Sequence, residues 1–126
     1  MNDEETFASV RYIVDDVPAA IDFYTTQLGF VLRSNPAPVF ADVTRGPLRL
    51  LLSGPQTSGA RATPDDAADA GRNRIHLIVD NLDAEIERLE AAKVPFRSEP
   101  TSGPGGRQIL IADPAGNLIE LFQPAG

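Results

Sequence analysis

The feature that most constrains how this 126-residue chain can fold is an internal repeat. Three blocks recur in the same order, at offsets of 65, 64 and 70 residues: VRYIVDDVPAAI (10–21) with IHLIVDNLDAEI (75–86), LRSNP (32–36) with FRSEP (96–100), and GPLRLLL (46–52) with GNLIELF (116–122). Blocks that keep their order with small changes in length indicate two copies of one structural unit, each of about 55 residues.

Each copy begins with a strand and continues into a helix. Apolar residues alternate with other residues over 10–14 and over 75–79, which predicts strands. The first helix is expected to follow Asp16 as its N-cap and to end at Gly29, and the second to follow Asn81. Three further strands are expected to close each copy, near 30–34, 38–44 and 47–53 in the first and near 95–99, 107–112 and 117–122 in the second. The predicted unit is therefore βαβββ, present twice.

These units predict a single α+β domain spanning the chain. Its expected parts are module 1 over about 8–53, a linker over 54–72 and module 2 over about 73–123. The connection around the linker (53–71) is long, small and polar, which is typical of a mobile segment or of a flap over a ligand site. We keep both interpretations.

Composition excludes several classes of function. The net charge of -7 disfavours nucleic acid as a partner. The absence of cysteine excludes disulfides, thiolate nucleophiles and cysteine metal sites. No apolar run approaches the length of about 20 residues that crosses a bilayer, and the acidic N-terminus does not resemble a signal peptide. We therefore expect a cytoplasmic protein without a membrane partner.

Two loop motifs superficially resemble binding sites. SGPGG (102–106) is rich in glycine but lacks the dinucleotide fingerprint, and is expected to be a hairpin loop. DDAAD (65–69) lacks the spacing and the terminal glutamate of a calcium loop, and is expected to be a solvated charge run.

The paired βαβββ units, with IDFYTTQLGF (21–30) in the first and DPAGNLIEL (113–121) closing the second, resemble the vicinal oxygen chelate superfamily. That superfamily includes glyoxalase I, extradiol dioxygenases, fosfomycin-resistance enzymes and bleomycin-resistance proteins. The resemblance covers about residues 8–123 and implies a cup-shaped, partly closed mixed sheet with the helices on its outer face. It also implies a homodimer. It does not identify a reaction, because one fold hosts many functions.

Enzymes of this superfamily draw up to four metal ligands from matched strand positions. By the resemblance, these positions are here Ser9, Leu50, Arg74 and Glu120. Glu120 alone is a good ligand, since leucine offers none and arginine repels a cation. His76 shares the face of Arg74 by strand alternation, but His76 and Glu120 would supply only two ligands. We therefore expect no metal or other cofactor, with Glu120 and His76 as the only weak metal candidates.

The implied cup has an inferred lining that is largely apolar with a few polar groups, as in small-molecule pockets. Strand alternation assigns twelve residues to it: Ser9, Arg11, Ile13, Leu48, Leu50, Leu52, Arg74, His76, Ile78, Leu118, Glu120 and Phe122. Seven of these are the predicted ligand-binding residues: Ser9, Arg11, Leu50, Arg74, His76, Glu120 and Phe122.

A glutamate inside an apolar strand needs a partner. The simplest partner for Glu120 is Arg74, with Arg11 or His76 as additional ones. Arg11 and Arg74 together exceed what one carboxylate needs, and the surplus charge would suit a carboxylate, phenolate or phosphate on a ligand. His76 is the only histidine, so His76 and Glu120 are the weak catalytic candidates for acid–base chemistry.

We interpret the chain as a metal-independent binder of a small organic ligand of anionic or aromatic character, by sequestration as in bleomycin-resistance-like proteins. The alternative is an enzyme, either a metal-dependent lyase or dioxygenase with an unusual ligand set or a metal-free isomerase. A third class is an interaction module with a filled cup. The sequence does not identify the ligand, and whether cups form within or between chains is left open.

Overall fold

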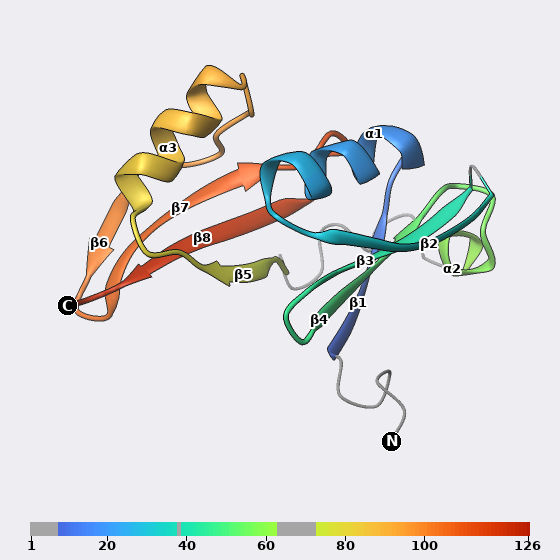
Figure 1. The fold of residues 1–126 in the computed structure, drawn as a ribbon, viewed down its shortest axis with the longest axis horizontal. Helices are drawn as coiled ribbons and strands as arrows, with labels where there is room; N and C mark the ends of the chain where they lie inside the picture. Colours follow the sequence, from blue (N-terminus) through green and yellow to red (C-terminus); the bar gives the residue numbers. More distant parts are fainter. Residues whose placement is uncertain (1–7, 38, 63–72) are drawn as a thin grey trace. The chain divides into compact units, whose positions relative to one another are not determined.

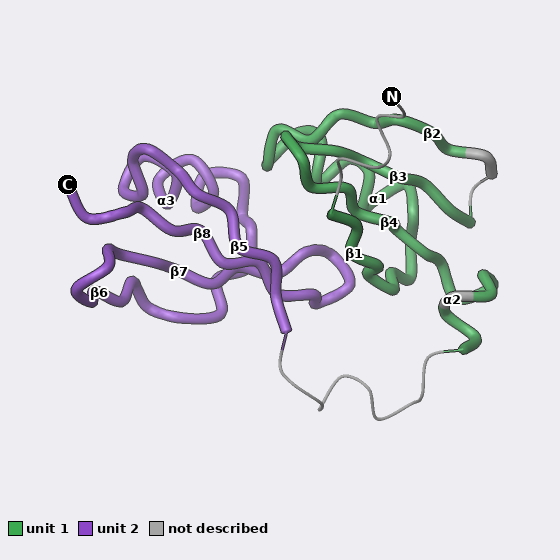
Figure 2. Tube along the Cα trace, turned by 90° about the horizontal axis from the view of Figure 1, so that it is seen from below, with its two compact units in different colours: residues 1–67 green, residues 68–126 purple. Residues whose placement is uncertain are grey.

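The computed structural model describes residues 8–37, 39–62 and 73–126. The chain divides into two compact units, residues 1–67 and 68–126 (Figure 2). These units contain the predicted modules 1 and 2. From here on the names module 1 and module 2 refer to the whole units, and each is described by itself.

Module 1 has one helical segment, four strands and a short second helix (Figure 1). Its elements are β1 (Ala8–Ile13), α1 (Val17–Asp22), which continues into the π-helical turn η2 (Phe23–Gln27), β2 (Val31–Ala37), β3 (Phe40–Arg45), β4 (Leu48–Ser53) and α2 (Ser58–Arg61). The strand order in the sheet is β1-β4-β3-β2. The β1–β4 pair is parallel and the other pairs are antiparallel.

Module 2 repeats this plan around its own helix. Its elements are β5 (Ile75–Ile78), α3 (Leu82–Ala91), β6 (Thr101–Gly103), β7 (Gly106–Ala112) and β8 (Leu118–Pro124). The order is β5-β8-β7-β6, again with a parallel first pair and antiparallel later pairs. The predicted α+β fold with two βαβββ modules is confirmed. Each described sheet is open, with β1 and β2 or β5 and β6 at its edges, so neither module closes its own sheet.

The helices begin where side-chain caps predict. Asp16 Oδ1 accepts a hydrogen bond from the Ala19 amide at 3.0 Å, and Asn81 Oδ1 accepts one from the Ala84 amide at 3.1 Å. Gly29 ends the first helical segment with a φ of 72°, a left-handed conformation that glycine adopts without strain. Both predicted caps and the predicted stop are confirmed.

Each helix covers one face of its own sheet. Contacts join α1 to β3 and β4, and α3 to β8. The fully or almost fully buried side chains between these layers are Tyr24, Val43, Leu50 and Leu52 in module 1 and Leu82, Leu89, Ile109, Ile111, Ile119 and Leu121 in module 2. We call the opposite face of each sheet its helix-free face. No helix among the described residues is long and apolar enough to span a bilayer.

One predicted strand is in the wrong place. The strand expected near 95–99 is an irregular segment with an isolated bridge between Phe96 and Ile111, and β6 begins only at Thr101. In this segment, backbone hydrogen bonds to β7 run only from Pro95 to Arg97, and the Leu110 amide then donates to Ser98 Oγ instead of to a backbone carbonyl. SGPGG (102–106) forms the predicted hairpin, as the turn between β6 and β7.

The predicted linker is described only in part. Residues 54–62 contain α2, whose N-cap Thr57 accepts a hydrogen bond from the Ala60 amide at 3.2 Å. Residues 63–72, including DDAAD (65–69), lie outside the described residues.

Candidate ligand site

Strand pairing places the polar residues of module 2 together on its helix-free face. In the parallel β5–β8 ladder, His76 lies opposite Glu120 and Ile78 lies opposite Phe122. Their neighbours Ile75, Leu77, Ile119 and Leu121 are buried and face the other way. Arg74 stands one pleat before His76 on the same side.

The loop before β8 sets which residues of that strand face this side. The Asp113 carboxylate accepts hydrogen bonds from the Ala115 amide at 3.0 Å, from the Asn117 amide at 2.8 Å and from Asn117 Nδ2 at 3.0 Å. This Asx-type turn fixes the end of the loop, and β8 starts at Leu118. Glu120, two residues later, lies between Ile119 and Leu121, which are buried beneath α3, and it therefore faces away from that helix.

Both carboxylate oxygens of Glu120 are engaged. Arg74 Nε lies 3.0 Å from Oε1 and donates a hydrogen bond to it, and His76 Nε2 lies 3.6 Å from Oε2. The expected ion pair between Arg74 and Glu120 is thus formed. The histidine contact is longer than a hydrogen bond, so it is electrostatic and depends on protonation of His76.

The cluster is buried at its carboxylate and open at its cations. Glu120 is 8% exposed, whereas the side chains of Arg74 and His76 are 34% and 48% exposed. The His76 ring lies 5.0 Å from the Phe122 ring with an interplanar angle of 37°, and Ile78 beside it is 59% exposed. Charge and apolar surface therefore stand side by side.

Leu50, which was predicted to line the cup, lies on the opposite face of its sheet. Leu50 pairs with Val10, and Leu52 pairs with Tyr12, so both lie on the face that α1 covers, where they are 0% exposed. The side chains beside Ser9 and Arg11 are instead Arg49 and Leu51. The matching residue for Glu120 in module 1 is therefore Leu51 and not Leu50.

The physical reason is a difference in loop length. In module 1, Arg45 pairs with Leu48 across a two-residue turn, whereas in module 2 Ala112 pairs with Leu118 across five residues. An alignment anchored on Gly46 and Gly116 ignores this difference and is off by one residue. A shift of one residue exchanges the two faces of a strand. The prediction that Leu48 and Leu52 share the face of Arg11 fails for the same reason.

Module 1 carries a polar network on its helix-free face. Arg49 Nε donates to Asp42 Oδ2 at 2.9 Å, and Ser34 Oγ donates to Asp42 Oδ1. Arg11 Nη1 donates to Ser53 Oγ at 2.8 Å. A further bond joins Arg33 Nε to Thr44 Oγ1 at 2.8 Å. These bonds connect β1 to β4, β4 to β3, and β3 to β2.

Asp42 is the centre of that network and was missed by the sequence reasoning. It is 5% exposed and sits between Ala41 and Val43, which is the same signal that singled out Glu120. Burial alone would raise the pKa of Asp42, but the hydrogen bonds from Ser34 and Arg49 and the charge of Arg49 outweigh it and lower this pKa below 3.8.

The residues present do not fit the metal centre that the resemblance implies. The matched positions on the two helix-free faces hold Ser9, Arg11, Arg49 and Leu51 in module 1 and Arg74, His76 and Glu120 in module 2. The Glu120 oxygen that would meet a cation is bonded to a guanidinium. Within the part of the chain that the structure describes, no three His, Cys, Asp or Glu side chains cluster closely enough to hold a metal ion.

The comparisons with known proteins agree with this fold. The model of the Glyoxalase/Bleomycin resistance protein/Dioxygenase superfamily matches residues 6–121. No curated protein matches the chain. Among solved structures, TnmS3, an antibiotic binding protein from Streptomyces sp. CB03234, is 28% identical with a TM-score of 0.73, over 94% of this chain and 95% of that one.

Two further solved structures are similar to this chain. A glyoxalase/bleomycin resistance protein/dioxygenase from Nocardioides is 29% identical with a TM-score of 0.70, over 94% of this chain and 83% of that one. Lactoylglutathione lyase from Agrobacterium tumefaciens is 24% identical with a TM-score of 0.70, over 93% and 92% of the two chains, and shares the fold. The family match over residues 6–121, together with the two βαβββ modules, shows that this chain belongs to the glyoxalase/bleomycin resistance protein/dioxygenase superfamily.

Proposed function

We propose that this protein binds an organic small molecule with a negatively charged group, without a metal, and sequesters it. The observation that carries the proposal is the cluster of Arg74, His76 and Glu120 on the helix-free face of module 2, beside the exposed Ile78. An arginine and a histidine held by one buried carboxylate, next to apolar surface, suit an anionic ligand with a hydrophobic body.

The guanidinium of Arg74 has donors left for a ligand. Its Nε is bonded to Glu120, and arginine has five N–H donors in all. Glu120 holds the guanidinium in place, so a ligand carboxylate, phenolate or phosphate would meet a preorganised donor. The His76 and Phe122 rings and the Ile78 side chain would contact the apolar part of the ligand.

Module 1 contributes further candidate ligand-binding residues. Ser9 and Arg11 lie on its helix-free face, as does Leu51, which takes the place of Leu50. Its network includes three arginines, of which Arg49 is paired with the buried Asp42 while Arg11 and Arg33 donate to the hydroxyls of Ser53 and Thr44, so this network also carries more positive than negative charge. The likeness to TnmS3, described as an antibiotic binding protein, supports an antibiotic-like natural product as the ligand class.

The test is binding to a panel of natural-product antibiotics that carry a carboxylate, phenolate or phosphate group, followed by thermal unfolding and calorimetry. A ligand at a hundredfold excess over its Kd stabilises the native state by about 2.7 kcal/mol. Arg74→Gln and Ile78→Ser should weaken binding at least tenfold. The matched control is Arg107→Gln, because Arg107 is also paired with a carboxylate, Asp83 at 3.0 Å, but on the helix side.

Two outcomes would contradict the proposal. The first is that no antibiotic in the panel stabilises the protein. The second is that a bound antibiotic is held equally well by the Arg74→Gln and Ile78→Ser variants, which would place its site elsewhere.

A second candidate function rests on the 3.6 Å separation of His76 and Glu120. Such a pair could move a proton in an isomerisation or a lyase reaction. An enzyme would convert its ligand, and His76→Gln would abolish turnover while retaining binding. Metal content, measured by plasma mass spectrometry after reloading, tests the metal-dependent version. Near-stoichiometric metal that disappears in Glu120→Ala would favour the enzyme over the sequestering protein.

The homodimer and the cytoplasmic location expected from the resemblance and the composition stay predictions. Light scattering during size-exclusion chromatography tests the first, since a dimer doubles the 13.5 kDa mass of the chain.

A further inference from the structure

We propose that module 2 carries a second ligand site, for an amphiphilic organic cation, on the helix-covered side of its sheet. This inference does not rest on the proposed function. It comes from a cavity that neither the strand pattern nor the Glu120 cluster explains.

The cavity lies between α3, β7 and the irregular segment that precedes β6. It has a volume of about 590 Å³, within the usual range of small-molecule sites. Its lining residues are Ile86, Glu90, Phe96, Arg97, Ser98, Glu99, Pro100 and Ile109. The segment leaves this space because it bridges to Ile111 only at Phe96 and does not continue as a strand.

This site and the Glu120 cluster lie on opposite faces of one sheet. Ile109 lines the cavity and pairs with Leu121, and both side chains are buried beneath α3. The next residue, Leu110, pairs with Glu120 on the helix-free face. Since neighbouring strand residues point in opposite directions, a ligand in the cavity cannot contact the Arg74–Glu120 pair.

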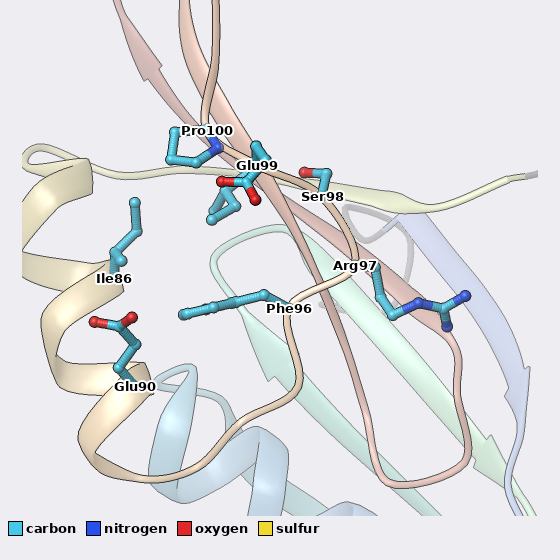
Figure 3. Close-up of a pocket in the computed structure, with 8 residues that line it drawn as sticks. Ile86, Glu90, Phe96, Arg97, Ser98, Glu99 and Pro100 are labelled. Carbon is cyan, nitrogen blue, oxygen red and sulfur yellow. The ribbon is translucent and has the colours of Figure 1, made fainter.

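Part of the cavity lining is apolar. Ile86 comes from α3, Phe96 from the irregular segment and Ile109 from β7, and all three side chains are at least partly buried. Figure 3 shows the Phe96 ring directed toward α3, in the space between Ile86 and Glu90. An aromatic or aliphatic group would replace water on these side chains, which favours its binding.

The charged groups of the cavity favour a cation. Among the described residues, no side chain forms an ion pair or a hydrogen bond with the Glu90 or Glu99 carboxylate. Arg97 also lines the cavity, but its side chain is directed away from α3 in Figure 3 and forms no ion pair with either carboxylate. Ser98 Oγ is already engaged, because it accepts a hydrogen bond from the Leu110 amide at 3.0 Å.

Of the other acids on α3, the two nearest its start are paired, whereas Glu87 has no ion-pair partner among the described residues and lies outside the cavity. Asp83 lies 3.0 Å from Arg107, and Glu85 lies 2.9 Å from Arg88. Glu90 and Glu99 are left to interact with what enters the cavity. The net charge of -7 adds a long-range attraction for cations. The ligand that suits both the apolar side chains and the two carboxylates of the cavity is a small molecule with an apolar body and an ammonium group.

The experiment titrates the protein with 3-phenylpropylammonium and follows the methyl carbon signals of Ile86 and Ile109 by NMR. We expect saturable shifts of both signals. The anion of matched size, 3-phenylpropionate, should bind at least tenfold more weakly. The double variant Glu90→Gln with Glu99→Gln should bind the amine about tenfold more weakly, since two favourable charge interactions are lost.

The controls separate this site from the other one. Glu87→Gln removes an acid from the same helix that does not line the cavity, and should leave amine binding unchanged. Arg74→Gln, which tests the proposed function, should also leave it unchanged. The inference is overturned if the two isoleucine signals do not move, if the anion binds as well as the amine, or if the double variant binds the amine normally.

Discussion

The helix-free faces of the two modules each hold a buried carboxylate, but different groups surround it. Each buries one carboxylate beside an arginine Nε, at 2.9 Å for Arg49 and Asp42 and at 3.0 Å for Arg74 and Glu120. In module 1 the polar groups around the carboxylate are bonded to one another across all four strands, with Asp42, Thr44 and Ser53 buried and the Arg11, Arg33 and Ser34 side chains exposed. In module 2 the cations are partly exposed, and Ile78 adds exposed apolar surface.

The difference shows how one architecture can satisfy a buried charge in two ways. A carboxylate on a sheet needs donors whatever its purpose. Where the neighbouring strands supply them, as with Ser34 and Arg49, the face is internally complete and contributes mainly to stability. Where Arg74, with 34% of its side chain exposed against 25% for Arg49, stands beside exposed apolar surface, the same kind of charge pair keeps donors for a ligand. We therefore expect substitutions in module 1 to change stability more than those on the corresponding face of module 2.

The largest effect on stability is expected at Leu50, the residue that the repeat alignment matched with Glu120. Leu50→Ala removes a fully buried side chain beneath α1 and should lower the free energy of unfolding by about 3 kcal/mol. Leu51→Ala, on the helix-free face, should cost about 1 kcal/mol. Urea unfolding followed by circular dichroism measures both. Equal costs for the two variants would contradict the register described for β4.

The module 1 network should be visible as a pH dependence of stability. Asp42→Asn loses charge-assisted hydrogen bonds and should cost about 2 kcal/mol at pH 7. Because folding lowers the pKa of Asp42, the contribution is fully present above the ordinary value of 3.8 and is lost as the pH falls through the lower folded value. The gap between wild type and Asp42→Asn should therefore shrink below pH 3.8. Urea unfolding at pH 7 and pH 3 measures it, and a gap that grows on acidification would be inconsistent with this role.

The corresponding pair in module 2 should matter less for stability. Glu120→Gln should cost about 1 kcal/mol, since its partner Arg74 is one-third exposed and is hydrated in either state. The same variant should weaken binding of an anionic ligand, because it frees the guanidinium from its fixed position. A stability loss larger than that of Asp42→Asn would reverse the comparison between the modules.

The smallest effect on stability is expected at Ile78. This side chain is 59% exposed, so Ile78→Ser should change the free energy of unfolding by less than about 0.5 kcal/mol. Thermal unfolding without ligand measures this change. A large destabilisation would mean that Ile78 is covered in the folded protein and serves packing, which would remove it from the ligand site.

Much of the fold follows from local signals in the sequence. Strand alternation, the Asp16 and Asn81 caps and the Gly29 stop depend on neighbouring residues only, and the structure confirms them. The Arg74–Glu120 pair followed from one strong physical rule, that a glutamate between two apolar residues needs a partner.

Other features depend on tertiary context. The face of Leu50 depends on the length of a turn, which an alignment of short blocks does not resolve. The network around Asp42 needs the β2–β3 register, which has shifts between Leu32 and Ser34. The cavity beneath α3 exists because the segment before β6 leaves the ladder, and no local pattern encodes that departure.

The two-residue turn between β3 and β4 also constrains which insertions and deletions module 1 could accept during evolution. Gly46 supplies the left-handed φ of 58° that so short a hairpin requires. Insertion or deletion of a single residue there would exchange the side chains that face α1 with those beside Ser9 and Arg11. A point mutation alters one side chain of the helix-free face, whereas one inserted codon would replace a whole strand's contribution. We expect variation in this turn to be tolerated only together with compensating changes along β4.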